Sequence, residues 1–129
     1  MAKLFFYIFN LLFLVLYLYP GSILGLLLYG NINKQPQLTE DFISNFLEVS
    51  SNHVYAFMLL SLLGFFNYFN SKKKLIIFYL FFIAIILEIF HIIIPQRSFE
   101  ISDLNGNIIG ISLSLLITYI FYYAKKNFS

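Results

Sequence analysis

Long apolar runs alternate with short polar segments along this chain. A helix that crosses a membrane needs about 20 mostly apolar residues. Four runs meet or approach that length, covering about 4–29, 53–69, 75–94 and 107–123. The first run contains Pro20 and Gly21, where we expect a kink or a break. The pattern predicts an all-α protein, an integral membrane four-helix bundle that forms a single domain over residues 1–129.

The segment between the first two runs, residues 31–52, is mostly polar. Between Thr39 and Val49 it carries apolar residues at helical spacing. That spacing indicates a short helix lying at the membrane interface with Thr39 as its N-cap. A plain loop is the alternative.

Lysine positions predict the orientation of the bundle. With four spans, Lys3, the 72–74 triplet and the 125–126 pair fall on one side, and Lys34 and Arg97 fall on the other. Lysine and arginine are enriched in cytoplasmic loops of membrane proteins. We therefore expect a multi-pass protein with both termini in the cytoplasm and with residues 31–52 and 96–106 outside.

Composition agrees with a membrane protein and excludes several functions. Hydrophobic residues make up 60% of the chain and charged residues 11%, whereas soluble domains carry about 25% charged residues. The net charge of +2 is too small and too scattered to indicate a nucleic-acid partner. The chain has no cysteine, so disulfides and thiolate metal sites are excluded.

Ionisable residues inside the predicted spans are the strongest functional signal. A charged side chain at the centre of a membrane helix costs at least about 2.5–3.5 kcal/mol. Glu88 and His91 are three residues apart and therefore share a helix face. By the predicted topology, other polar residues reach the same outer level. The six that we expect to converge there are His53, Glu88, His91, Arg97, Asp103 and Asn107.

Each of these residues also has a structural interpretation. Glu88 and Arg97 could form an ion pair that fixes a helix hairpin. Asp103 could be the N-cap of the last helix, Asn107 could hydrogen-bond across helices, and His53 could be an interfacial residue without a role. Two small residues, Gly64 and Gly110, are expected to permit close helix packing.

Residues 88–110 carry a resemblance to a known family. Glu88, Pro95, Arg97, Asp103, Leu104, Asn107 and Gly110 stand at the spacings of a Glu, a Pro-x-Arg turn, an Asp-Leu pair and an Asn-x-x-Gly helix start. This stretch resembles the VanZ-like membrane protein family. His53 matches the His of that family's Asp-Lys-x-x-His motif. The chain departs from the family at His91, where Gln is usual, and at Val49 and Ser50, where Asp and Lys are common.

The resemblance spans about residues 50–115, and it implies a fold and a setting rather than a reaction. It points to the bacterial cytoplasmic membrane and to a cell-envelope context. The family's best-known member is associated with low-level resistance to the glycopeptide teicoplanin, which implies an envelope or glycopeptide-resistance role here.

Three kinds of function fit the six residues. The first is a non-enzymatic protein that binds a lipid headgroup, glycolipid or glycopeptide, in which Arg97 contacts an anionic group, Asn107 adds amide hydrogen bonds, and Glu88 and Asp103 hold Arg97. The second is a membrane enzyme acting on a lipid-linked substrate, with His53 or His91 as acid or base. The third is a structural or partner-binding subunit.

No cofactor and no metal are expected from the sequence. Glu88, His91, His53 and Asp103 could supply four nitrogen and oxygen ligands. However, His91 stands where the family has Gln, so a site that depends on His91 cannot be shared chemistry of the family. No catalytic residue is identified by a nucleophile motif.

Overall fold

The computed structural model describes residues 2–43 and 46–128, and most of them are helical. The helices are α1 (Ala2–Leu18), α2 (Ile23–Tyr29), α3 (Ser51–Phe90) and α4 (Ile101–Phe128). Two short strands, β1 (Phe42–Ile43) and β2 (Glu48–Val49), form an antiparallel pair. The all-α prediction is confirmed, apart from this small hairpin.

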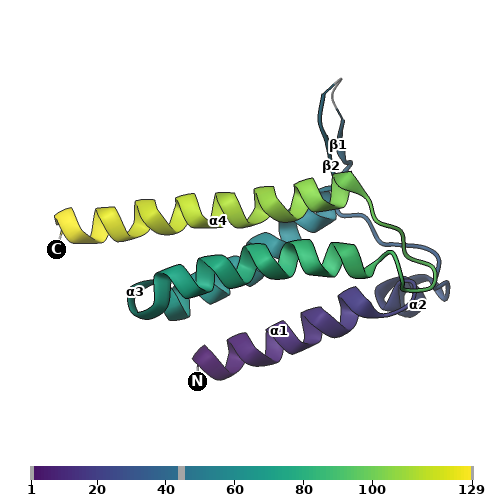
Figure 1. The fold of residues 1–129 in the computed structure, drawn as a ribbon, viewed down its shortest axis with the longest axis horizontal. Coiled ribbons are helices and arrows are strands. Elements are labelled where there is room, and N and C mark those ends of the chain that lie inside the picture. Colours follow the sequence, from purple (N-terminus) through teal and green to yellow (C-terminus); the bar gives the residue numbers. More distant parts are fainter. Residues whose placement is uncertain (1, 44–45, 129) are drawn as a thin grey trace.

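Helix α3 is a helical hairpin rather than a single rod (Figure 1). Lys72 has non-helical angles, φ −142° and ψ 43°, and the chain reverses there. We call residues 51–71 the first limb and residues 73–90 the second limb. A Cβ on Gly64 would lie 3.1 Å from Ile76 Cδ1, so the missing side chain lets the limbs approach. The break predicted between the second and third spans is confirmed.

The first predicted span, 4–29, is not one continuous helix. Helices α1 and α2 meet at 83°. Pro20 lacks an N–H for the helical ladder, and Gly21 adopts φ +77°, a conformation that favours glycine. Ser22 is the N-cap of α2, because its hydroxyl accepts a hydrogen bond from the Gly25 N–H at 2.9 Å. The expected interruption is therefore a sharp corner.

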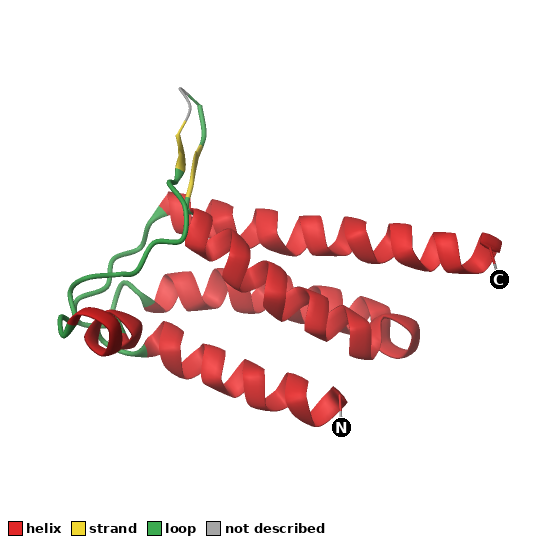
Figure 2. Ribbon diagram, turned by 180° about the vertical axis from the view of Figure 1, so that it is seen from behind, coloured by secondary structure: helices red, strands yellow, loops and turns green. Residues whose placement is uncertain are grey.

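The interfacial helix predicted for residues 39–49 is wrong for the part that the structure describes. Those residues form a β-hairpin, in which Phe42 pairs with Val49 and Ile43 with Glu48. Residues 44 and 45, in the middle of the predicted helix, lie outside the described residues. The Thr39 hydroxyl hydrogen-bonds to the Tyr55 hydroxyl at 3.1 Å instead of capping a helix. The hairpin projects from the helices (Figure 2), and β2 contacts α4 at its base, where Asn105 donates to the Glu48 carbonyl oxygen at 3.0 Å.

Two helix boundaries near the polar motif also differ from the sequence expectation. The second limb of α3 ends at Phe90 rather than at residue 94, and α4 begins at Ile101 rather than at residue 107. Asp103 therefore lies in the first turn of α4 and is not its N-cap. His91 is the C-cap of α3 and not an interior residue.

Helix α4 packs closely on the first limb of α3. A Cβ on Gly106 would lie 2.6 Å from the Ser50 carbonyl oxygen, and one on Gly110 would lie 2.5 Å from the Val54 carbonyl oxygen. Real side chains do not approach backbone atoms this closely, so the contact requires glycine at both positions. The packing role expected for Gly110 is confirmed.

Both termini and the bend of α3 lie at one end of the molecule, while α2 and the hairpin lie at the other (Figure 1). Lys3, Lys72–Lys74, Lys125 and Lys126 therefore share one end. Lys34 and Arg97 belong to the loops at the opposite end. The separation of the basic residues that the sequence predicted is present in the fold.

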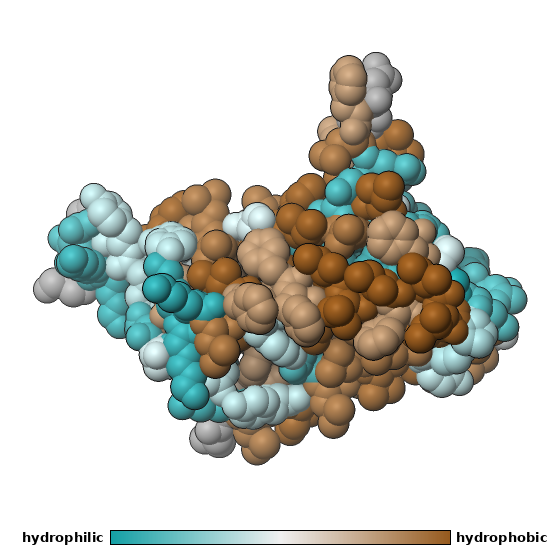
Figure 3. Space-filling view, in the orientation of Figure 1, coloured by the Kyte–Doolittle hydropathy of each residue, from teal (hydrophilic) through white to brown (hydrophobic). Residues whose placement is uncertain are grey.

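Apolar side chains cover much of the outer surface of the helices. Hydrophobic residues form a band between two polar ends in Figure 3, and large exposed examples include Leu27 at 74% and Phe66 at 75% exposure. The accessible surface is 8611 Å², whereas a compact soluble protein of 15.1 kDa would expose about 7,100 Å². The chain is thus a thin layer of helices with an apolar exterior.

One helix in the described part of the chain, Ile101–Asn127, is both long and apolar enough to cross a membrane. The bent pair formed by α1 and α2 is a second candidate if it is counted as one span. The same length and hydropathy occur in core helices of soluble proteins, where such a helix is mostly buried; here 33% of the most apolar window of α4 is buried.

Gly110→Ala should destabilise the fold, because the new methyl group must push α4 away from the first limb of α3. The expected loss is about 1–3 kcal/mol in the free energy of unfolding. Unfolding in mixed detergent–SDS micelles measures it. Ser112→Ala, on the exposed side of the same helix, is the matched control and should be close to neutral. Equal effects of the two substitutions would contradict the close contact.

Candidate functional site

Polar side chains from three helices meet inside the bundle near the α2 end. Tyr17 lies in the last turn of α1, His53 in the first turn of α3, and Glu88 in its last turn. Asp103 and Asn107 lie in the first two turns of α4. Glu88 and Asn107 are fully buried, and His53 and Tyr17 are each 8% exposed. A polar group buried in an apolar bundle requires partners, and these residues partner one another.

His53 is held through both ring nitrogens. Its Nδ1 lies 2.5 Å from the Tyr17 hydroxyl and 3.0 Å from Asn107 Oδ1. Its Nε2 lies 3.3 Å from Asp103 Oδ2. The interpretation of His53 as an interfacial residue without a role is therefore wrong, and the interhelical hydrogen bonding expected of Asn107 is confirmed.

The partners of His53 fit two tautomers. The Tyr17 hydroxyl donates to Asn107 Oδ1 at 2.9 Å, and Asn107 Nδ2 faces the Ala84 carbonyl oxygen at 3.4 Å. Asn107 Oδ1 can only accept, so in the tautomer with the proton on Nδ1, Nδ1 donates to it at 3.0 Å. In the other tautomer, Nδ1 accepts from the Tyr17 hydroxyl and Nε2 donates to Asp103 Oδ2.

Glu88 and His91 form the second part of the cluster. Glu88 Oε1 lies 3.4 Å from His91 Nδ1 and accepts a hydrogen bond from the Glu100 N–H at 3.0 Å. His91 Nε2 donates to the Tyr17 carbonyl oxygen at 3.1 Å, and its ring stacks on the Tyr17 ring with centroids 5.0 Å apart. His91 is 1% exposed, so it positions Glu88 and the end of α1.

Arg97 does not join this cluster as an ion pair. It forms no ion pair with Glu88 or with any other described carboxylate, so the predicted Glu88–Arg97 pair, and the idea that Glu88 and Asp103 hold Arg97 directly, are wrong. Its guanidinium instead donates to the carbonyl oxygens of Leu16 at 3.3 Å and Tyr19 at 3.4 Å. These carbonyls end α1 and have no partner within that helix, so Arg97 acts as its C-terminal cap.

Partial burial lowers the pKa of Arg97, and the nearby charges of Tyr17, Asp103 and Glu88 act in the opposite direction. An arginine remains protonated in proteins. Arg97 therefore places a positive charge beside the negative end of the α1 dipole.

The structure brings together five of the six predicted residues: His53, Glu88, His91, Asp103 and Asn107. It adds Tyr17, which the sequence argument missed. The spacing of aromatic residues could have identified Tyr17, because Phe6, Phe13 and Tyr17 lie on one face of α1 and are buried. A hydroxyl on a stripe that is buried must find a polar partner.

A groove of about 450 Å³ opens beside the cluster, between α1, α2 and the first limb of α3. Most of its lining is apolar, including Phe13, Leu28 and Leu59. Its polar lining residues include His53 and Arg97. The groove thus combines a long apolar wall with a cationic residue.

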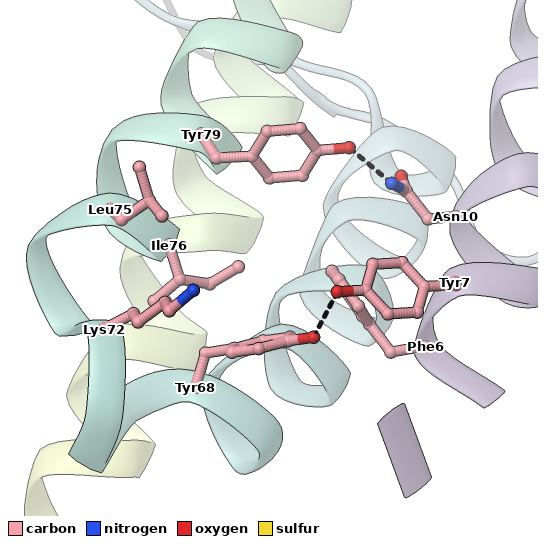
Figure 4. Close-up of a pocket in the computed structure, with 8 residues that line it drawn as sticks. All are labelled: Phe6, Tyr7, Asn10, Tyr68, Lys72, Leu75, Ile76 and Tyr79. Carbon is pink, nitrogen blue, oxygen red and sulfur yellow. Dashed lines mark hydrogen bonds between the residues drawn. The ribbon is translucent and has the colours of Figure 1, made fainter. Parts of the chain in front are cut away.

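A second cavity, of about 320 Å³, lies at the opposite end between α1 and the bend of α3 (Figure 4). The Tyr68 hydroxyl donates a hydrogen bond to the Tyr7 hydroxyl there at 2.6 Å. Asn10 donates to the Tyr79 hydroxyl, and Lys72 completes the rim. This cavity holds no described cluster of acids and histidines.

Comparisons with models of known protein families, with curated proteins and with solved structures found no match.

Tyr17→Phe should destabilise the protein, because it removes a buried hydroxyl from His53 and Asn107 while keeping the ring. Leaving buried polar atoms without a partner costs about 1–3 kcal/mol. Thermal unfolding in detergent measures the change. Tyr19→Phe, at a partly exposed side chain two residues along, should have little effect. A Tyr17→Phe protein as stable as wild type would contradict the hydrogen bonds described here.

Proposed function

We propose that this chain is a multi-pass membrane protein that binds an anionic lipid or lipid-linked molecule. The acyl part occupies the groove between α1, α2 and α3, and the anionic headgroup meets Arg97. The observation that carries this proposal is the apolar groove with Arg97 and His53 among its lining residues.

The membrane setting is supported by the distribution of side chains. Exposed large hydrophobic residues occur on α1, on both limbs of α3 and on α4, and contiguous apolar patches of this extent are rare on soluble monomers. The basic residues gather at one end of the rods, as expected for the cytoplasmic end. Both limbs of α3 and the α1–α2 pair then accompany α4 as spans, and the polar cluster lies toward the outer leaflet.

The ligand class is supported by the composition of the groove. Sites for amphiphiles are mostly apolar with a few polar groups that fix orientation. Arg97 offers forked donors to a phosphate or carboxylate, and only part of its hydrogen-bonding capacity is used by Leu16 and Tyr19. Among the envelope lipids, glycolipids and glycopeptides that the VanZ-like resemblance implies, those with a phosphate or carboxylate have the required anionic group.

A membrane enzyme is the second candidate, and one observation favours it. Asp103, His53 and Tyr17 form a connected chain of polar groups, an arrangement that can move a proton between a substrate and a carboxylate. His53 also lines the groove. This candidate uses the same ligand site and adds a chemical step at His53.

Topology can be tested with single cysteines, because the chain has none of its own. Ser98→Cys should react with a membrane-impermeant maleimide on intact cells, and Ser71→Cys should react only after permeabilisation. Both positions are exposed. The reverse pattern would place Arg97 in the cytoplasm and contradict an outer-leaflet site. Recovery of the protein in the soluble fraction would contradict the membrane setting itself.

Lipid binding can be tested by native mass spectrometry of the protein with phosphatidylglycerol and with phosphatidylcholine. Leu59→Trp should fill the groove and reduce bound lipid at least about fivefold, a loss of about 1 kcal/mol. Phe66→Trp, exposed on the same limb but outside the groove, is its control. Arg97→Gln keeps donors for the α1 carbonyls, and should abolish the preference for phosphatidylglycerol.

The Leu59→Trp variant tests the groove, and the Arg97→Gln variant tests the headgroup contact. Equal lipid binding by the Leu59→Trp and Phe66→Trp proteins would contradict the groove as the site. An unchanged preference for phosphatidylglycerol in the Arg97→Gln protein would contradict headgroup recognition by Arg97.

A further inference from the structure

Three side chains in the polar cluster are arranged as a metal site would require. Ligand atoms of His53, Glu88 and Asp103 all lie within 4.8 Å of one another. His53 Nε2 and Asp103 Oδ2 are 3.3 Å apart. Two ligands of a tetrahedral ion with bonds near 2.1 Å are about 3.4 Å apart. That pair already has the separation of two ligands of one ion, and Glu88 is close enough to complete a set of three.

Glu88 supplies an independent sign that a positive group belongs here. Glu88 is fully buried, and its Oε2 has no hydrogen-bond partner among the described residues. An unpaired buried carboxylate oxygen is costly, because no donor replaces the water that it lost. The other oxygen, Oε1, is fixed by the Glu100 N–H and lies against His91. One oxygen is thus anchored while the other is left available as a ligand.

The groups behind the three side chains match the outer shell of a metal site. Metal-binding imidazoles donate their second N–H to an acceptor, which fixes the ring and the tautomer. In the tautomer with the proton on Nδ1, His53 does this toward Asn107 Oδ1. Its Nε2 then presents a lone pair to Asp103 Oδ2 at 3.3 Å, and a cation between the two satisfies both groups, with Glu88 close enough to be the third ligand.

We propose that His53, Glu88 and Asp103 bind one divalent transition-metal ion, for which Zn²⁺ is the probe. One imidazole and two carboxylates, with no thiolate, suit Zn²⁺ or Mn²⁺. Three protein ligands leave a further coordination position. His53 also lines the groove, so the ion site and the proposed lipid site share this residue. The ion site does not depend on the lipid, since its ligands come entirely from this chain.

His91 stands where the VanZ-like family has Gln, which spoke against a metal site that depends on His91. His91 is not one of the three ligands proposed here, so this difference does not weigh against the site. It contacts Glu88 Oε1 and the carbonyl of Tyr17, so it acts behind the ligand. The competing explanation is a doubly protonated His53 that pairs with Asp103 without any ion, and the experiment must separate the two.

The test measures Zn²⁺ on the untagged protein, purified in detergent, treated with chelator, reloaded and dialysed. Elemental analysis should find about one ion per chain. Competition with a chromogenic chelator should show binding weakened more than about 100-fold by Asp103→Asn and by Glu88→Gln, since even outer-shell changes cost 10–100-fold. Glu40→Gln, a carboxylate outside the cluster, is the matched control and should bind like wild type.

A measurement on the unmodified protein covers the case in which a variant does not fold. Co²⁺ in place of Zn²⁺ should give the visible absorption of a tetrahedral site, and added Zn²⁺ should remove it. Absence of stoichiometric ion on the folded wild-type protein would overturn the proposal in favour of a protonated His53. So would equal Zn²⁺ affinity in the folded Asp103→Asn and Glu40→Gln proteins, which would place the ion elsewhere.

Discussion

The burial of the Tyr17–His53–Asn107 hydrogen bonds constrains the rest of this structure. These three residues come from α1, α3 and α4, and each would be costly to bury alone. Directional bonds between them fix how far each helix can rotate or slide, which apolar packing alone does not do. Around them the helices reach close contact through Gly106 and Gly110. The apolar surfaces bring the rods together, and the polar residues select one arrangement of them.

The same constraint explains why structural and functional interpretations of the cluster are compatible. Asn107 and His91 are hydrogen-bonded to α1 and α3. Glu88 retains an oxygen without a partner among the described residues, and His53 keeps one nitrogen facing the Asp103 carboxylate. A purely structural network has no reason to leave such groups unsatisfied in an apolar interior. The contacts that hold the helices together thus leave Glu88 and His53 with atoms that can bind a ligand.

Sequence reasoning succeeded where one-dimensional signals are strong. The apolar runs located α1, both limbs of α3 and most of α4, the Lys72–Lys74 run marked the reversal in α3, and five polar residues were correctly grouped. It failed where tertiary contacts decide. Residues 39–49 have helical spacing, yet Phe42–Ile43 and Glu48–Val49 pair as strands. Asn105 and Tyr55 hydrogen-bond to Glu48 and Thr39 beside them. Arg97 has acidic neighbours in sequence, yet it binds carbonyls at the end of α1 that no local pattern reveals. Tyr17 was missed because its partners are 36 and 90 residues away.

Unequal attachment of the helices has a consequence for access to the groove. Helix α4 lies along α3 with backbone in near contact, whereas α1 packs mainly on α3 and is tied at its far end by Tyr17 and Arg97. Moving α1 away from α3 therefore costs less free energy than moving any other wall of the groove. In the proposed membrane setting, a molecule arriving from within the bilayer enters by displacing α1 sideways, without crossing the polar surface. Whatever then occupies the groove would strengthen the docking of α1, so occupancy and the order of this helix are thermodynamically linked.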